Sequence, residues 1–128
     1  MAKGERPTVL LVDDTPDDRE LVRSLLKLCG DCRVIEAENG LEAVELARGE
    51  RPDLIIMDLR MPELDGYEAA NRIRQDPTLR SVPMVAYTAF YSYSLTDAAL
   101  EAGFDEYVQK SATEEQMQEL VSRYLKIG

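Results

Sequence analysis

The chain has 128 residues, a formal net charge of −10 at pH 7 and no histidine. Its length suits one globular domain with its own hydrophobic core. Nucleic-acid binding needs an excess of lysine and arginine, so this acidic composition argues against nucleic acid as a direct partner. The composition fits a bound cation or basic protein partners instead. The absence of histidine excludes catalytic sites that depend on an imidazole.

The first seven residues are polar and lack the apolar segment of a signal peptide. No stretch has the length and hydrophobicity of a membrane span, so we expect no membrane insertion. We therefore expect a cytoplasmic protein with a short tail at residues 1–7 and one domain at residues 8–127. Because the last expected helix reaches the end of the chain, we expect a stand-alone domain without an attached output domain, with a domain cut from a longer protein as the alternative.

Five short segments have the composition of β-strands, at residues 9–12, 33–36, 54–57, 82–87 and 106–109. The runs at 9–12 and 54–57 are apolar without alternation, which indicates strands buried on both faces. The runs at 33–36 and 106–109 contain fewer apolar residues and have polar flanks, as edge strands do. Helical spacing of apolar residues predicts a helix after each strand.

Alternating strands and helices favour an α/β fold, with a five-stranded parallel sheet and helices on both faces. Placing the two most apolar strands in the centre gives the strand order 2-1-3-4-5, which is flavodoxin-like. Local signals set the expected helix ends. Thr15 and Asp65 are expected N-caps, and Thr113 opens a capping box before the last helix. Gly49 is expected to end the second helix, and the third is expected to run to Pro77.

Acidic residues follow both central strands. Asp13 and Asp14 come directly after the first strand, and Asp58 follows the third. The predicted order puts the switch point between these strands, where parallel sheets bind ligands outside their carboxyl ends. Three converging carboxylates repel one another, so the arrangement favours a hard cation. Mg²⁺ prefers oxygen ligands, here the aspartates and one backbone carbonyl, which we assign to Arg60.

Thr88 and Lys110 end the next two strands and are expected at the same edge of the sheet. A cation, a lysine and a hydroxyl around a carboxylate form a receptor for a phosphoryl group, because phosphoryl transfer needs mainly charge neutralisation and alignment. Asp58 would be the nucleophile and would become an acyl phosphate. Each residue alone also fits a plain structural role in a turn, at a strand end or on the surface. The joint arrangement is what favours a functional site.

The sequence resembles the response-regulator receiver domains of two-component signalling. The matching motifs are Val12-Asp13-Asp14, Met57-Asp58-Leu59-Arg60-Met61-Pro62 with Asp65-Gly66, Tyr87-Thr88-Ala89, and Tyr107-Val108-Gln109-Lys110. The resemblance covers residues 8–127. It implies a sensor histidine kinase or a histidine phosphotransfer protein as donor, phosphorylation of Asp58, and inward movement of Thr88 and Tyr107. It also implies a changed surface on the fourth helix, the fifth strand and the fifth helix.

A protein of this kind is a phosphoacceptor that assists its own phosphorylation and dephosphorylation rather than a classical enzyme. Its output would be contact with a downstream protein target, and a homodimer is a further option. The chain departs from the family at Ser111, where a proline usually follows the lysine, often through a cis bond. A cis bond without proline costs about 2.5–4 kcal/mol, so we expect a trans Lys110–Ser111 bond.

Two alternatives belong to other classes. An aspartyl-phosphate hydrolase of the small phosphatase type would need a second aspartate two residues after the nucleophile, where this chain has Arg60. A flavodoxin-like cofactor binder would need a loop rich in serine, threonine and glycine after the first strand. Residues 13–18 carry four aspartates instead and would repel a phosphate.

An aromatic segment follows Thr88 and contains Phe90, Tyr91 and Tyr93. It fits either simple packing over the fourth helix or a partner surface, and we favour the partner surface because exposed aromatic clusters are typical of interfaces. The two cysteines, Cys29 and Cys32, lie where a helix is expected to end. Redox pairs are activated at helix N-termini, so we expect these cysteines to be reduced and structural.

Overall fold

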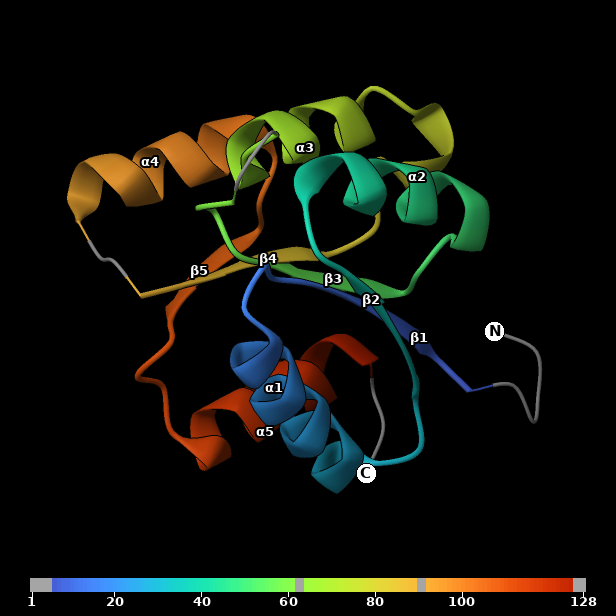
Figure 1. The fold of residues 1–128 in the computed structure, drawn as a ribbon, viewed down its shortest axis with the longest axis vertical. Coiled ribbons are helices and arrows are strands. Elements are labelled where there is room, and N and C mark those ends of the chain that lie inside the picture. Colours follow the sequence, from blue (N-terminus) through green and yellow to red (C-terminus); the bar gives the residue numbers. More distant parts are fainter. Residues whose placement is uncertain (1–5, 62–63, 90–91, 126–128) are drawn as a thin grey trace.

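The computed structural model describes residues 6–61, 64–89 and 92–125, without the side chains of Cys29 and Tyr93. Within these residues the strands form one parallel sheet in the order β2-β1-β3-β4-β5, which confirms the predicted fold class and strand order (Figure 1). The strands are β1 (Thr8–Val12), β2 (Arg33–Ala37), β3 (Leu54–Met57), β4 (Met84–Thr88) and β5 (Glu106–Gln109). The helices are α1 (Pro16–Cys29), α2 (Gly40–Glu50), α3 (Gly66–Arg74), α4 (Tyr93–Ala102), α5 (Glu114–Leu125) and the short 3₁₀ helix η1 (Pro77–Leu79).

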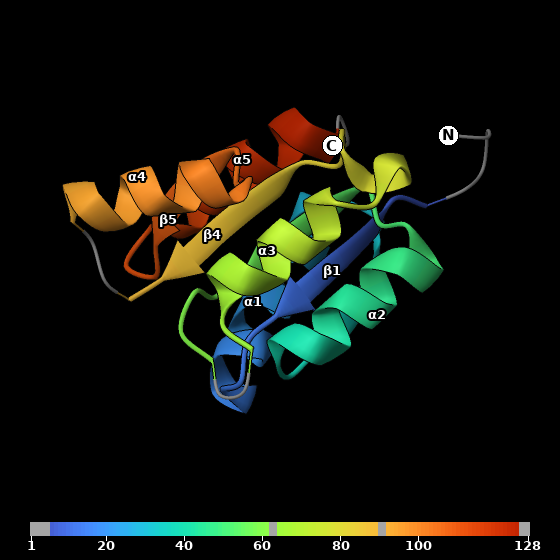
Figure 2. The ribbon, with the colours of Figure 1, turned by 90° about the horizontal axis from the view of Figure 1, so that it is seen from above.

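The sheet is covered on both faces. Helices α1 and α5 lie together on one face, and α2, α3 and α4 lie side by side on the other (Figures 1 and 2). Side chains of β1 and β3 alternate between two separate hydrophobic clusters, one under each group of helices. Leu10 and Ile55 belong to the cluster beneath α2, α3 and α4, whereas Leu11 and Ile56 belong to the cluster beneath α1 and α5. Burial on both faces explains why these strands are apolar without alternation.

Most of the expected helix ends are present. Asp65 accepts a hydrogen bond from the Glu68 amide, and Thr113 and Gln116 form the reciprocal bonds of a capping box. Thr15 does occupy the N-cap position of α1, but its side chain makes no capping bond. Its backbone amide donates to the Asp13 carboxylate instead, which ties the start of α1 to the end of β1.

Strands β1 and β2 are each one residue longer than predicted, and three further elements have boundaries that differ from the sequence prediction. Helix α2 continues past Gly49 to Glu50, and Arg51 takes the left-handed conformation that ends it, with φ 47°. Pro52 then prevents further helix. Helix α3 ends at Arg74 rather than Pro77, because Asp76 caps the separate helix η1. Strand β4 begins at Met84, after Pro83, and includes Thr88.

Candidate functional site

The predicted site residues meet at the carboxyl edge of the sheet. Asp13 follows β1, Asp58 follows β3, Thr88 ends β4 and Lys110 follows β5. Backbone hydrogen bonds hold these ends in register: the Asp58 amide donates to the Val12 carbonyl at 2.9 Å, and the Lys110 amide donates to the Thr88 carbonyl at 2.7 Å. The sheet therefore fixes the positions of the side chains that leave it.

Carboxylate oxygens of Asp13, Asp14 and Asp58 all lie within 4.8 Å of one another. Asp13 and Asp58 are buried, while Asp14 is exposed at the mouth of the cluster. Like charges this close destabilise one another unless a cation neutralises them. An all-oxygen donor set open to solvent on one side fits Mg²⁺, which prefers oxygen ligands and keeps several of its waters.

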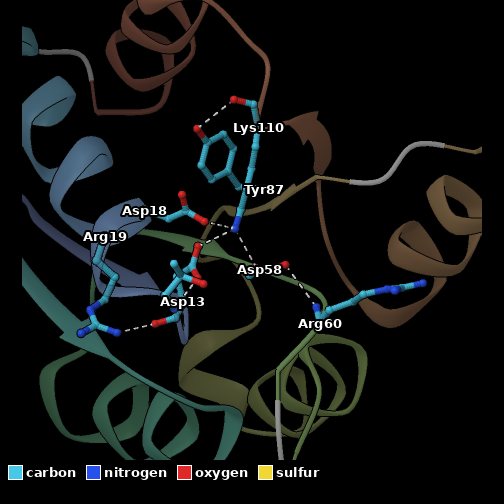
Figure 3. Close-up of polar contacts among 8 residues, drawn as sticks. Asp13, Asp18, Arg19, Asp58, Arg60, Tyr87 and Lys110 are labelled. Atoms are coloured by element: carbon cyan, nitrogen blue, oxygen red, sulfur yellow. Dashed lines mark hydrogen bonds and ion pairs between the residues drawn. The ribbon is translucent and has the colours of Figure 1, made fainter.

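Lys110 carries the positive charge of the site. Its Nζ lies 2.8 Å from Asp13 Oδ2, 2.7 Å from Asp18 Oδ2 and 2.9 Å from Asp58 Oδ2 (Figure 3). Burial alone would lower the pKa of this ammonium, but the hydrogen bonds that it donates to the three carboxylates outweigh burial and raise the Lys110 pKa above its ordinary value. Lys110 is thus held protonated and oriented toward Asp58.

Asp58 is held through both of its oxygens. Oδ1 accepts a hydrogen bond from the Arg60 amide at 3.1 Å, and Oδ2 accepts one from Lys110 Nζ at 2.9 Å. The loop that follows is anchored by the Gly66 amide, which donates to the Leu59 carbonyl at 3.0 Å. A carboxylate restrained in this way is oriented before any ligand arrives, which lowers the entropic cost of reaction.

Asp13 is held by α1 as well as by the sheet. Thr15 donates its amide to Asp13 Oδ1 at 2.9 Å, and Arg19 donates Nη1 to the Asp13 carbonyl at 2.6 Å. Arg19 also donates Nε to Glu36 on β2 at 3.2 Å. Arg19 therefore ties the first helix, the acidic turn and the edge strand together.

Sequence reasoning missed the roles of Asp18 and Arg19. Both lie in the first turns of α1, four and five residues after Asp14. Asp14 precedes α1, which begins at Pro16, so its spacing from Asp18 gave no helix-face signal in the sequence. Only the packing of α1 against the sheet shows that Asp18 points at Lys110.

The sequence profile of the response regulator receiver domain matches residues 9–122. The chain belongs to this family. It is 35% identical over 118 residues to the polar-differentiation response regulator DivK of Brucella anthropi, a match covering 92% of this chain and 95% of DivK. It thus matches a two-component signalling protein along most of both chains.

Two similar solved structures of this family contain a bound metal ion. The receiver domain of the sensor histidine kinase PA1611 from Pseudomonas aeruginosa, solved with magnesium in its active-site cleft, is 33% identical with a TM-score of 0.86, over 95% of this chain and 99% of that one. The Mn²⁺-bound response regulator Rcp1 is 30% identical with a TM-score of 0.82, over 94% and 95% of the two chains.

The remaining predicted positions of this receiver domain lie around the site. Thr88 is buried at the end of β4, and Tyr107 on β5 is half-buried against the cluster beneath α2, α3 and α4. The neighbouring Tyr87 lies on the opposite face and its hydroxyl donates to the Lys110 carbonyl at 3.5 Å. Burial raises the pKa of Tyr87, so its hydroxyl stays protonated and can keep donating.

The Lys110–Ser111 bond is trans, as predicted from the absence of proline. Phe90 and Tyr91, and the side chain of Tyr93, lie outside the described residues, so the aromatic partner surface stays a prediction. The Cys32 thiol is free and half-buried, and burial raises its pKa. In the part of the chain that the structure describes, no helix is long and apolar enough to span a membrane.

Proposed function

We propose that this receiver domain accepts a phosphoryl group on Asp58 from a sensor histidine kinase or a histidine phosphotransfer protein. One observation carries the proposal: three carboxylates and one lysine converge at a single edge of the sheet, with Asp58 directly hydrogen-bonded to Lys110. Carboxylates pair with a lysine in many structural ion pairs. A cluster of three carboxylates, in which the buried Asp58 is oriented by hydrogen bonds to both of its oxygens, suits a phosphoryl acceptor because it offers a cation site beside a nucleophile.

The metal is proposed to be Mg²⁺, held by Asp13, Asp14, Asp58 and the Arg60 backbone carbonyl. The presence of Mg²⁺ or Mn²⁺ in two similar receiver structures supports this choice. When bound, the cation would neutralise negative charge on the phosphoryl oxygens and on the clustered carboxylates. Asp14 is the exposed member and gives the site its access to solvent.

In the transfer itself, an Asp58 carboxylate oxygen forms a bond to phosphorus while the bond from phosphorus to the donor imidazole nitrogen breaks. The electron pair of that bond leaves with the imidazole. Lys110 Nζ, already beside Asp58, is placed to pair with a phosphoryl oxygen. The Thr88 hydroxyl, at the end of the adjacent strand, is proposed to hydrogen-bond another.

The proposed switch acts through Thr88 and Tyr107. Movement of Thr88 toward the phosphoryl group would open space beside it on β4, and Tyr107 on the neighbouring strand would turn inward. The surface of α4, β5 and α5 would change with it and would control a downstream protein, with Phe90, Tyr91 and Tyr93 contributing to that contact. A cytoplasmic location, a homodimer and self-assisted dephosphorylation stay predictions of the same kind.

Membership of the receiver family does not support the hydrolase alternative. A receiver domain and a hydrolase differ in how they react with a phosphate donor. A receiver takes up one phosphoryl group per chain and keeps it for a measurable time, whereas a hydrolase turns over continuously.

The proposal is tested by incubating the protein with acetyl phosphate and Mg²⁺ and following the intact mass. We expect the addition of one phosphoryl group, lost in Asp58→Asn and in the presence of a chelator. Asp97→Asn, which removes an exposed carboxylate on α4, serves as the control and should label like the wild type. Labelling that persists in Asp58→Asn, or sustained release of phosphate without a labelled chain, would contradict the proposal.

A further inference from the structure

Asp18 is a fourth carboxylate at the site. It lies in the first turn of α1, and its Oδ2 is 2.7 Å from Lys110 Nζ, as close as the lysine comes to any carboxylate of the cluster (Figure 3). The two residues are 92 positions apart in the chain, so the contact depends on the packing of α1 against the sheet. Helix α1 therefore supplies an anionic partner for the site lysine.

The three partners of Lys110 differ in what else they do. Asp13 and Asp58 are proposed metal ligands, and their side chains are 2% and 9% exposed. Asp18 is 35% exposed and has no proposed part in metal binding. A cation bound at the cluster would interact with the carboxylates of Asp13 and Asp58, which weakens their attraction to the lysine. Asp18 would not coordinate the cation, so its attraction to the lysine would be unchanged. The contact between Asp18 and Lys110 is thus the one that metal binding leaves in place.

A phosphoryl group on Asp58 needs the same ammonium. Lys110 has three N–H donors, and in the unphosphorylated protein its hydrogen bonds go to three carboxylates. Pairing with a phosphoryl oxygen therefore weakens at least one existing contact. The carboxylate of Asp18 also repels the incoming phosphoryl charge through the solvent at the mouth of the site.

We propose that Asp18 is a positioning residue that competes with the phosphoryl group for Lys110 and so weakens the phosphorylated state relative to the unphosphorylated one. This rests on the proposed phosphorylation of Asp58. Asp18 orients the lysine toward Asp58 before transfer and opposes its full engagement afterwards. The stability of the phosphorylated state therefore depends on Asp18, a residue of α1 that is not one of the proposed metal ligands.

The test uses beryllofluoride, which mimics the phosphoryl group of an aspartyl phosphate, at saturating Mg²⁺. Its affinity is measured by titration of the backbone amide NMR spectrum for the wild type and Asp18→Asn. We expect Asp18→Asn to bind about fivefold more tightly, the factor that corresponds to about 1 kcal/mol, near the upper end for a partly exposed ion pair. Because the competition is electrostatic, the ratio should fall toward one as salt is raised.

Asp17→Asn is the matched control, since Asp17 is an exposed carboxylate in the same helical turn. It removes the same charge from the N-terminus of α1 and should bind like the wild type. The same spectra report whether each variant is folded, and Asp18→Ala carries the test if Asp18→Asn does not fold.

The experiment distinguishes failure of the proposed role of Asp18 from failure of the proposed phosphorylation of Asp58. Equal affinity of the wild type and Asp18→Asn at low salt, or an equal gain in Asp17→Asn, would overturn the role of Asp18 alone. A ratio that does not change with salt would also overturn it, since a purely structural effect is not screened. If the wild type showed no Mg²⁺-dependent response near Asp58, the proposed function itself would fail.

Discussion

Gly66 packs directly against the backbone of Asp58. A β-carbon built on Gly66 would lie 2.5 Å from the Asp58 carbonyl oxygen and 2.8 Å from Leu59 Cα. Both neighbours are main-chain atoms of the segment that carries Asp58, the proposed phosphoacceptor, so neither can move away without moving the loop. The start of α3 is thereby fixed against the end of β3, and the glycine makes that approach possible.

Gly66→Ala is therefore expected to lower the free energy of unfolding by about 1–3 kcal/mol, the usual range for a side chain forced into a packed site. It should also slow labelling of Asp58 by acetyl phosphate, because the shifted loop carries the carboxylate with it. Chemical denaturation and the labelling rate measure the two effects. Gly49→Ala is the control: its β-carbon would meet nothing within 4 Å, so this helical substitution should be neutral or stabilising by up to about 1 kcal/mol. A stable Gly66→Ala variant with normal labelling would refute the argument.

Mg²⁺ is expected to stabilise the fold because it binds the folded carboxylate cluster. Linkage gives about 2.7 kcal/mol when the metal is present at roughly 100 times its dissociation constant. Asp14→Asn should lose most of this gain. Its stability without metal should be unchanged or higher, since Asp14 is exposed and its charge opposes the other two carboxylates.

Asp13→Ala makes an informative comparison. Asp13 accepts the Thr15 amide and pairs with Lys110, so this variant should lose stability without metal as well as the gain from metal. Thermal unfolding with and without saturating Mg²⁺ measures both quantities. A melting temperature of the wild type that does not respond to Mg²⁺ would speak against the metal site as a whole.

Arg19 is expected to support the metal site without touching the metal. It donates to the Asp13 carbonyl and to Glu36, and its side chain is largely buried. Arg19→Met should lower the free energy of unfolding by about 1–3 kcal/mol, because it leaves the Asp13 carbonyl without this donor. It should also weaken Mg²⁺ binding, since the turn that carries two proposed ligands keeps its Thr15 contact but loses the one from Arg19.

Arg23→Met is the control for the expected effect of Arg19 on Mg²⁺ binding. Arg23 also pairs with Glu36, but the bond to the Asp13 carbonyl belongs to Arg19. Each substitution removes one positive charge and one contact to Glu36, and Arg19→Met also removes a 3.6 Å ion pair with the exposed Glu38. Calorimetric titration with Mg²⁺ should therefore show weaker binding for Arg19→Met than for Arg23→Met. Equal affinities would mean that the turn holds its shape without Arg19.

The sequence could predict the sheet and the residues that leave it, because both depend on local pattern. Unbroken apolar runs identify β1 and β3 as central, and a parallel sheet brings the residues after its strands to one edge. This reasoning placed Asp13, Asp58 and Lys110 correctly. It could not place Asp18 or Arg19, whose roles depend on how α1 is rotated against the sheet.

The helix ends also divide into those that the local sequence predicted and those that it did not. Asp65 and Thr113 cap their helices through bonds to residues three positions later, which are local and were predicted. Gly49 was expected to end α2 because glycine takes the left-handed conformation easily. Arg51 takes that conformation instead, and the Arg51 amide closes the helix by donating to the Ala47 carbonyl. The following Pro52 decides the outcome, since a helix cannot continue readily into a proline.

Cys32 should react slowly with alkylating reagents. Burial raises the pKa of its thiol, and the nearby Asp31 carboxylate raises it further, while Arg6 opposes both. A raised pKa leaves less thiolate at a given pH, and the thiolate is the reactive form. In a Cys29→Ala background, alkylation of the folded protein near pH 8 should be slower than that of the protein unfolded in denaturant.

Asp31→Asn tests the electrostatic part of this argument. It removes the carboxylate and also frees Arg6, which pairs with Asp31 at 3.5 Å. Both changes lower the thiol pKa, so the alkylation rate of Cys32 should rise at pH 8. The difference between the two variants should vanish at high pH, where the thiol of each is fully ionised. A rate that does not change in Asp31→Asn would assign the slow reaction to burial alone, and a rate equal to that of the unfolded chain would contradict both causes.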